Sequence, residues 1–230
     1  MLRFLRLLKW LLAAAVLLAL AYQLWIFGHL LWWTKFNPDE TRFMSLRLSE
    51  LRERQPDAQL RKQWVPYDRI SVHLKRAVIA AEDDGFVDHE GFDWEGIQKA
   101  MEKNRKKGRA VAGGSTISQQ LAKNLFLSPS RSYLRKGQEA AITFMMEAVM
   151  DKRRILEIYL NVVEWGDGVF GAEAAAQRYY RVSAAKLGPD QAARLAVMLP
   201  NPRKYEKTFG PRLAAHASRV AARMHYSQVP

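Results

Sequence analysis

The hydrophobic and polar positions divide the chain into three parts, and the first is an apolar run. Residues 10–34 contain no Asp, Glu, Lys or Arg, and about 20 apolar residues suffice for a helix to cross a bilayer. Tryptophans stand at both ends of the run, where aromatic side chains anchor a helix at the membrane surface: Trp10, Trp32 and Trp33. The pattern predicts one transmembrane helix over 10–34, preceded by a short segment over 1–9.

A cleaved signal peptide is the alternative interpretation of this run. The sequence Ala19-Leu20-Ala21 has the small-x-small form of a cleavage site after an apolar region of suitable length. Apolar residues nevertheless continue beyond it, and a secreted domain would have no reason to carry them. Three basic residues before the run favour a cytoplasmic N-terminus, with the remaining chain on the outer side of the membrane: Arg3, Arg6 and Lys9.

The second part, residues 35–65, is polar, and we interpret it as a linker with a short helix near 41–54. The third part, 66–230, shows helical spacing of apolar residues, starting with a helix from Ile70 that Gly85 ends as a C-cap. No convincing alternating strand pattern appears, so the expected fold class is mainly α. Further helices are predicted at 93–106, 116–126, 132–150, 153–162, 170–180, 189–199 and 211–225.

Composition and charge narrow the range of ligands. The 230 residues are 49% hydrophobic, which is enough for one packed domain, and they include no cysteine, which excludes disulfides and thiolate metal sites. The formal net charge is +13. A membrane-tethered domain with this charge is expected to bind anionic lipid headgroups or other anionic ligands. Nucleic acid is not expected, because a domain outside the membrane meets phosphates mainly on lipids and lipid-linked intermediates.

The acidic residues are concentrated in the segment AAEDDGFVDHEGFDWEG, residues 80–96. Glu82 leaves the first domain helix at the edge of its buried face, and partial burial with nearby carboxylates raises the pKa of such a group. A carboxylate with a raised pKa can transfer protons near neutral pH. If Glu82 is considered alone, the alternative to a catalytic role is an ordinary solvated helix end. A calcium-binding loop is not expected, because its characteristic spacing of acidic residues is absent.

Two basic segments follow. In RKKGRAVAGGSTISQQLAKN, residues 105–124, a positive loop leads to a helix capped by Ser115 or Thr116, and such a helix start attracts phosphate. Gly114 stands at the position where a P-loop requires its phosphate-binding lysine, so this segment is not a P-loop. We expect the helix to present a polar face toward a ligand, and simple exposure of this face to solvent is the alternative. The face consists of Gln119, Gln120, Lys123 and Asn124.

In the second basic segment, 131–161, Arg135 and Lys136 precede Glu139 by about one helical turn. The three side chains should therefore lie together on neighbouring turns, where an ordinary surface ion pair is the alternative. Asp151 is expected to cap the helix that follows.

These segments together resemble the five ordered motifs of the peptidoglycan glycosyltransferases of glycosyltransferase family 51: EDDGFVDHEGFDWEGI, GGSTISQQLAKN, RKGQE, KRRILEIYLN and WGDGVFGAEAAAQRYY. The resemblance covers roughly residues 66–206, and one such motif alone would be weak evidence. With an N-terminal anchor and no transpeptidase domain, the chain is similar to the single-function members. The resemblance implies a lysozyme-like α fold for 66–230, with a groove divided into donor and acceptor sites.

The resemblance also implies a reaction and its residues. A lipid-linked glycan strand would be transferred to lipid II with inversion, forming a β-1,4 bond and releasing undecaprenyl pyrophosphate. Glu82 matches the catalytic base, Glu139 matches a catalytic carboxylate beside the pyrophosphate, and the loop 105–114 matches a mobile flap. Further positions match substrate-binding residues: Asp83, Phe86, His89, Ser115, Thr116, Gln119, Gln120, Lys123, Asn124, Arg131, Arg135 and Lys136.

The implied location is the bacterial inner membrane, with one membrane pass, a cytoplasmic N-terminus and a periplasmic catalytic domain. The expected partners are lipid II, the lipid-linked strand and the membrane, with cell-wall synthesis or division proteins as further candidates. No cofactor is implied as obligatory, and a role for Mg²⁺ or Mn²⁺ at Glu139 stays open. Two other functions remain as hypotheses: a lysozyme-like lytic enzyme, and a tethered module that binds anionic polymers. Residues 207–230 are assigned only a packing helix.

Overall fold

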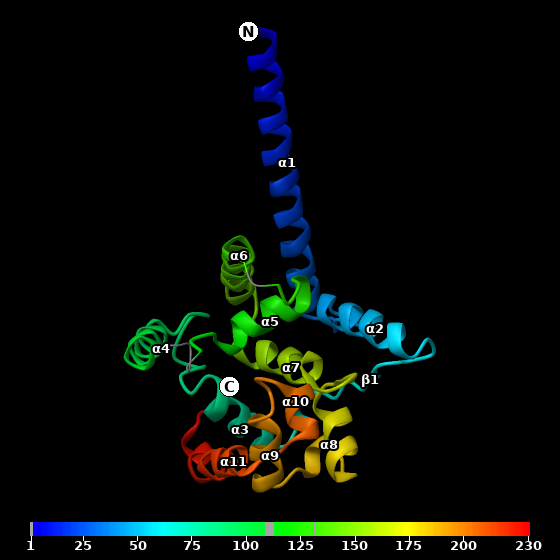
Figure 1. The fold of residues 1–230 in the computed structure, drawn as a ribbon, viewed down its shortest axis with the longest axis vertical. Coiled ribbons are helices and arrows are strands. Elements are labelled where there is room, and N and C mark those ends of the chain that lie inside the picture. Colours follow the sequence, from blue (N-terminus) through cyan, green and yellow to red (C-terminus); the bar gives the residue numbers. More distant parts are fainter. Residues whose placement is uncertain (1, 109–112, 131) are drawn as a thin grey trace.

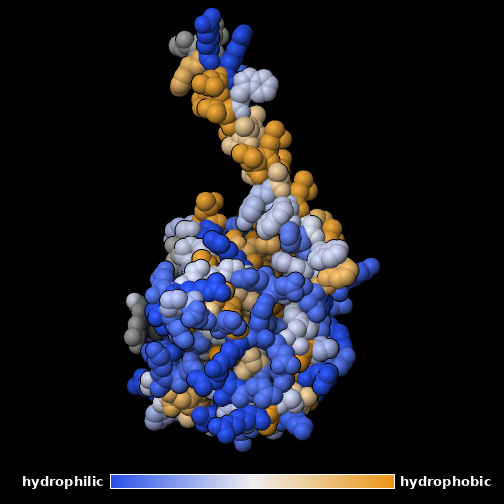
Figure 2. Space-filling view, turned by 90° about the vertical axis from the view of Figure 1, so that its right-hand side faces the viewer, coloured by the Kyte–Doolittle hydropathy of each residue, from blue (hydrophilic) through white to orange (hydrophobic). Residues whose placement is uncertain are grey.

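A long N-terminal helix projects from a helical domain in the computed structural model, which describes residues 2–108, 113–130 and 132–230 (Figure 1). This helix, α1 (Leu2–Trp33), is 32 residues long. The span Arg3–Trp33 has a mean hydropathy of 2.1 and is long and apolar enough to cross a membrane. In Figure 2 apolar side chains dominate the upper part of the molecule, whereas polar side chains dominate the visible face of the domain. The apolar helix predicted at 10–34 is confirmed and begins earlier.

The domain is mainly α, as predicted. Its helices α5 and α7 cross the middle of the domain, α6 lies near α1, and α3, α9 and α11 lie at the end remote from α1 (Figure 1). All eight helices predicted between Ile70 and 225 are present, with small shifts at their ends: α3 (Val72–Glu82), α4 (Trp94–Lys107), α5 (Ile117–Phe126), α6 (Tyr133–Val149), α7 (Lys152–Val162), α8 (Ala172–Tyr180), α9 (Pro189–Ala196) and α11 (Pro211–Arg223).

Local capping accounts for several helix starts. The side chain of Thr116 accepts from the backbone N–H of Gln119, and the Gln119 side chain accepts from the Thr116 N–H, so the predicted capping box is confirmed. Asp151 caps α7 as expected. The predicted end of α3 at Gly85 is wrong, because the helix stops at Glu82 and Asp83 takes a non-helical C-cap conformation. Glu82 is therefore the last residue of its helix.

The structure also contains short elements that the sequence pattern does not predict. Helix α10 (Pro202–Lys207) follows α9, and three strands form a small sheet in the order β1-β3-β2: β1 (Arg61–Lys62), β2 (Glu164–Gly166) and β3 (Val169–Phe170). Strand β1 pairs parallel to β3, and β2 pairs antiparallel to it. Strands of two or three residues are too short to show an alternating pattern. The sheet ties the end of the predicted linker to the domain.

The segment after α1 is also built into the domain. The predicted helix near 41–54 is present as α2 (Arg42–Arg54), and it packs against α5. The lower end of α1 contacts the same region, because the rings of Trp25 and Trp33 lie 6.1 and 5.3 Å from the ring of Phe126 on α5. Helix α1 also packs against α6 through a pair of amides, Gln23 and Gln138, whose nitrogen and oxygen atoms lie 2.7 and 3.1 Å apart. The helices that carry the candidate site thus hold the base of α1.

Candidate active site

Glu82 lies at the C-terminal end of α3 and is held by an amide from α5. The Gln120 Nε2 donates a 2.7 Å hydrogen bond to Glu82 Oε2. The other end of the same amide is fixed as well, because the hydroxyl of the fully buried Tyr159 donates to Gln120 Oε1 at 2.9 Å. Burial raises the pKa of Glu82, and the hydrogen bond from Gln120 and the charge of Lys123 lower it in part. A carboxylate in this state can accept a proton near neutral pH.

Asp83 connects the end of α3 to the start of α5. Its carboxylate is buried and lies 2.8 Å from His89 Nε2 through Oδ1, while Oδ2 accepts from the Ile117 N–H at 2.9 Å. Phe86 is fully buried beneath the same loop, with its ring against His89. The start of α5 is therefore satisfied by a protein carboxylate. This arrangement corrects the expectation that the helix start attracts phosphate.

Half of the polar face predicted for α5 is turned inward. Thr116, Gln119 and Asn124 are buried, and Gln119 is used by the capping box. Only Gln120 and Lys123 of the predicted face remain partly exposed. The helix lies between α6 and α7, so a wider part of its circumference is covered than the apolar spacing indicates. Gln120 and Lys123 are thus the more exposed side chains of this face, and Asn124 lines the same hollow as they do.

A cluster of cations lies beside this face. On α6, Arg135 Nη1 donates to Glu139 Oε2 at 2.6 Å, and Lys136 Nζ binds the other oxygen, Oε1. Lys136 also lies 3.2 Å from the exposed Ser115 hydroxyl. Glu139 is only 3% exposed, which argues against an ordinary surface ion pair. The buried Nε of Arg135 has no hydrogen-bond partner, so this guanidinium still has a donor to offer.

Lys123 interacts electrostatically both with the candidate general base and with the cluster on α6. Its partners are Glu82, Glu139, Arg135 and Lys136. Burial lowers the pKa of Lys123, and the nearby Glu139 opposes that shift. Positive charge held in a partly buried groove acts on an anion more strongly than the same charge in water.

A metal ion does not fit Glu139 in this arrangement. Both of its oxygens are already bound by cationic side chains, which disfavour a second cation. Among the described residues, no group of three or more His, Cys, Asp or Glu side chains is placed to hold a metal. The predicted site residue Arg131 and residues 109–112 of the predicted flap lie outside the described part of the chain.

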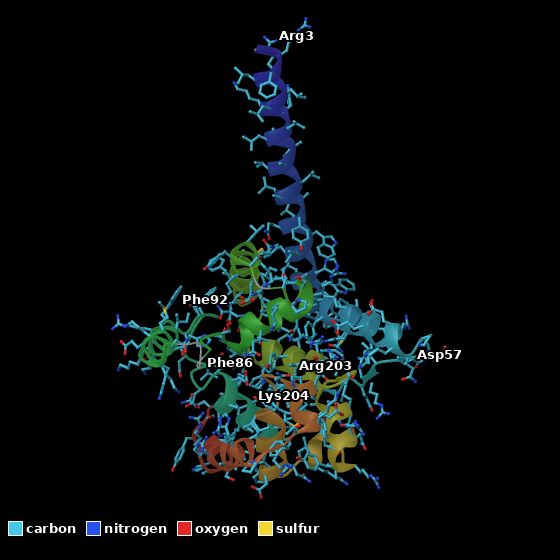
Figure 3. All side chains as sticks on the ribbon, in the orientation of Figure 1. Arg3, Asp57, Phe86, Phe92, Arg203 and Lys204 are labelled. Atoms are coloured by element: carbon cyan, nitrogen blue, oxygen red, sulfur yellow. The ribbon has the colours of Figure 1, made fainter. Side chains whose placement is uncertain are left out.

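Two hollows meet at the Glu82–Gln120 hydrogen bond. The acidic hollow, about 170 Å³, is lined by Glu82, Asp83, Asp84, Asp93, Gly114, Arg223 and their neighbours. The basic hollow, about 160 Å³, is lined by polar and apolar side chains, the polar ones being Arg47, Gln120, Lys123, Asn124, Glu164, Asn201 and Arg203. Figure 3 shows Phe86 on the α4 side of the domain and Arg203 on the α2 side. Glu82 lines the first hollow and its hydrogen-bond partner Gln120 lines the second, and we call the two hollows together the groove.

Several side chains of this groove were not predicted from the sequence. Arg223 reaches the acidic hollow from α11, and its Nη2 donates to the carbonyl of Ala80. Ser227 donates to Asp84 at 2.9 Å. The predicted packing helix over 211–225 thus also contributes to the groove. Its spacing shows only an amphipathic helix, and no local pattern reveals that one arginine reaches across to α3.

Glu82, whose pKa is raised, interacts electrostatically with Lys123, which also interacts with Glu139, Arg135 and Lys136. A general base close to cations that can stabilise an anionic leaving group is typical of a group-transfer enzyme. The chain belongs to the transglycosylase family, whose model matches residues 48–225. The family expected from the five motifs is therefore confirmed, together with its lysozyme-like helical domain. The match begins within the predicted linker, in agreement with the packing of α2 against α5.

Three relatives, each named biosynthetic peptidoglycan transglycosylase, are similar over nearly their whole lengths. The protein from Aromatoleum aromaticum is 72% identical over 215 residues, which cover 94% of both chains. The protein from Azoarcus sp. is 68% identical over 225 residues, covering 96% of this chain and 97% of the relative. The protein from Dechloromonas aromatica is 64% identical over 226 residues, covering 98% of both chains.

Tyr159→Phe tests the control of the base by Gln120. Without the hydroxyl, the amide loses the group that orients it, and its hydrogen bond to Glu82 weakens. Because that bond lowers the raised pKa of Glu82, the pKa should rise further. A base must be ionised, so the ascending limb of the pH profile of kcat/KM should move to higher pH, with activity retained at high pH.

The matched control is Tyr226→Phe, which removes a hydroxyl from a side chain that is 80% exposed. This variant should keep the wild-type profile. An ascending limb that stays in place in Tyr159→Phe, with the protein folded, would show that Tyr159 does not act on the base.

Proposed function

We propose that this protein is a membrane-anchored peptidoglycan glycosyltransferase that polymerises lipid II into β-1,4 glycan strands. The observation that carries the proposal is that Glu82, a carboxylate with a raised pKa held by Gln120, interacts with Lys123, which in turn interacts with the α6 cations. An alcohol nucleophile needs a base, and a pyrophosphate leaving group needs positive charge. A membrane-linked polymerisation requires both in the same site.

In the proposed reaction, the 4-hydroxyl of the acceptor sugar attacks the anomeric carbon of the donor strand. The new C–O bond forms on the face opposite the bond to pyrophosphate, which breaks with its electron pair moving to the phosphate oxygen. Glu82 takes the hydroxyl proton, and the anomeric configuration inverts. Lys123, Arg135 and Lys136 stabilise the developing charge on the pyrophosphate.

The groove assigns the two substrates to different sides of Glu82. The acidic hollow suits an acceptor, since its carboxylates accept hydrogen bonds from sugar hydroxyls and would repel a pyrophosphate. The donor lies on the side of Lys123, next to the α6 cations. Glu139 holds Arg135 and Lys136 through its two oxygens, so its role in this proposal is to position the cations. No step requires a metal ion.

The anchor places this groove close to the membrane surface. We assign α1 as a single pass through the bacterial inner membrane, with Arg3, Arg6 and Lys9 in the cytoplasm and the catalytic domain in the periplasm. Helix α6 packs against the base of α1 and carries two nearly fully exposed apolar side chains, Tyr133 and Leu134. These two side chains suit contact with lipid. Such contact would place the α6 cations, which we assign to the pyrophosphate, at the depth of the lipid headgroups.

The stereochemistry of the product tests the proposal. Detergent-solubilised protein with labelled lipid II should yield long glycan chains, and a muramidase specific for β-1,4 bonds should digest them to disaccharides. Muramidase-resistant chains would contradict inversion.

Protease protection of the domain in right-side-out vesicles, or loss of the N-terminal segment from the mature protein, would contradict the assigned anchor.

A further inference from the structure

We infer that a hollow between helices α4, α10 and α11 binds the acidic peptide that the acceptor lipid II carries on its muramic acid. The peptide brings carboxylates, and this hollow, which we call the α11 hollow, offers cations to receive them. The inference rests on the proposed function, because it needs the acceptor sugar in the acidic hollow. It goes further by assigning a site to a part of the substrate that takes no part in the reaction.

The first argument is the size and charge of the α11 hollow. Its volume is about 910 Å³, against about 170 Å³ for the acidic hollow, and ligand sites commonly have about 300–1,000 Å³. Among the described residues that line it, none is acidic and five are basic: Lys103, Lys204, Arg212, His216 and Arg219. A concave surface that carries one sign of charge attracts ligands of the opposite sign.

The second argument is that these cations are not neutralised within the protein. In the described part of the chain, none of the four lysine and arginine side chains of the α11 hollow forms an ion pair, and all four are exposed. In the basic hollow, by contrast, Arg47 and Arg203 are both held by carboxylates. Unpaired charges of one sign repel each other at short range, and an anionic ligand would remove that cost.

The third argument is the placement of charge on α11. The basic residues of this helix are separated by four, three and four positions, which places them along a single face: Arg212, His216, Arg219 and Arg223. Three exposed positions away from this face hold Ala215, Ser218 and Ala222 instead. The charge is therefore concentrated and not spread over the exposed surface. The spacing alone fits an ordinary amphipathic helix, and the walls from α4 and α10 turn this face into a hollow.

The fourth argument is continuity with the acceptor side of the groove. Arg223, at the end of the same face, lines the acidic hollow, and α4 contributes Gly96 to the acidic hollow and Lys103 to the α11 hollow. Burial lowers the pKa of His216, and the charges of Arg219 and Arg223 lower it further, so these side chains lie close enough to interact. An acceptor sugar in the acidic hollow can therefore extend its peptide along α11.

The length of the basic face and its distance from the anchor favour a short peptide. From Arg212 to Arg223 the helix rises by about 17 Å, and a peptide of about five residues, as in lipid II, spans about 17 Å when extended. Helix α11 lies at the end of the domain remote from α1 (Figure 1), so a site for membrane lipid headgroups is not expected there. An acidic peptide fits this position better than an anionic lipid.

The experiment is a competition between two forms of lipid II that carry different labels. One form keeps the free carboxylates of its peptide, and in the other form they are amidated. The two are supplied in equal amounts in a non-ionic detergent. Every added monomer enters the strand as the acceptor, so the ratio of the two labels in the product reports their use as acceptors. Wild-type protein should favour the acidic form about fivefold, the upper value for one exposed ion pair.

Three variants test the walls of the hollow. The pair Arg212→Gln/Arg219→Gln removes two exposed charges from α11 and should reduce the ratio to nearly one. Lys103→Gln changes the wall from α4 and should reduce the ratio in part. The matched control is Arg69→Gln/Lys186→Gln, which removes the same charge at exposed positions outside the hollow and should keep the wild-type ratio. Because the readout is a ratio within one reaction, a partial loss of folded protein does not change it.

The outcomes separate this inference from the proposed function. Wild-type protein that incorporates neither form would contradict the proposed function. Equal incorporation of both forms by wild-type protein would overturn the inference alone. A preference for the acidic form that survives in Arg212→Gln/Arg219→Gln and in Lys103→Gln would show that the peptide binds elsewhere. A preference that falls equally in the control pair would show an effect of net charge, and it would also overturn the α11 hollow as the site.

Discussion

Glu82→Gln is expected to reduce the rate of polymerisation by at least about 10²-fold, the usual contribution of a positioned general base. The amide keeps the shape of the carboxylate but cannot take the proton of the acceptor hydroxyl. Donor binding should be retained, because Lys123 and the α6 cations are untouched. The measurement is the rate at saturating lipid II, together with the affinity of the inactive variant for labelled lipid II.

The matched control for this prediction is Glu90→Gln. Glu90 lies in the same acidic segment and is exposed, so the same chemical change should leave the rate near that of the wild type. Near-normal polymerisation by Glu82→Gln would remove Glu82 from the role of base. Loss of lipid II binding along with activity would indicate that the variant has lost the groove as a whole.

Lys136→Ala is expected to weaken binding of the donor by about 1.5 kcal/mol, the lower end for a hydrogen bond to a charged group. That free energy corresponds to about a tenfold higher KM for the lipid-linked donor. Lys136 is half-exposed and lies between Glu139 and Ser115, so its removal should cost little stability. Glu139 keeps its bond to Arg135 in the variant.

Lys106→Ala is the control for Lys136→Ala, since Lys106 is an exposed lysine in the last turn of α4. This control loses the same charge from the protein and should keep the wild-type KM. If both variants weaken donor binding equally, the effect comes from net charge. If neither does, Lys136 has no contact with the pyrophosphate.

The sequence predicts the helices of this fold well because their signals are local. Thr116 and Asp151 cap α5 and α7 at the positions expected from the sequence. The spacing of apolar residues from Ile70 onward locates α3. The end of α3 was misplaced, since Gly85 is a plausible C-cap by residue type, but Asp83 leaves the helix to bond His89 and Ile117. The residue at which α3 ends therefore depends on contacts with another helix.

The residues of the candidate site also fall into two groups, those that local motifs reveal and those that only the fold reveals. Glu82, Lys123 and the α6 cations lie in recognisable motifs, and the structure brings them close enough to interact electrostatically through Lys123. Glu164 and Arg223 lie outside any pattern of charge that points to a site, and they reach the groove only through β2 and α11. Tyr159 has the apolar spacing of a core residue, and only the fold shows that its hydroxyl orients Gln120.

Helices α1 and α2 are hydrogen-bonded to elements that carry the candidate site. Gln23 of α1 is bonded to Gln138, the residue before Glu139 on α6. Arg47 of α2 holds Glu164 at the other end of the groove. The segments that precede the domain therefore contact both sides of the proposed donor site. This arrangement accounts for a family match that begins at residue 48, before the predicted domain boundary at 66.

The most direct test of the central claim is to give the anchored protein labelled lipid II and, separately, purified sacculi. The account predicts glycan chains from lipid II, with one undecaprenyl pyrophosphate released for each bond formed, and no soluble fragments from sacculi. Muropeptides released from sacculi, without chains from lipid II, would contradict it in favour of a lytic enzyme. Binding of glycan without either product, by folded protein, would contradict it in favour of a non-enzymatic module.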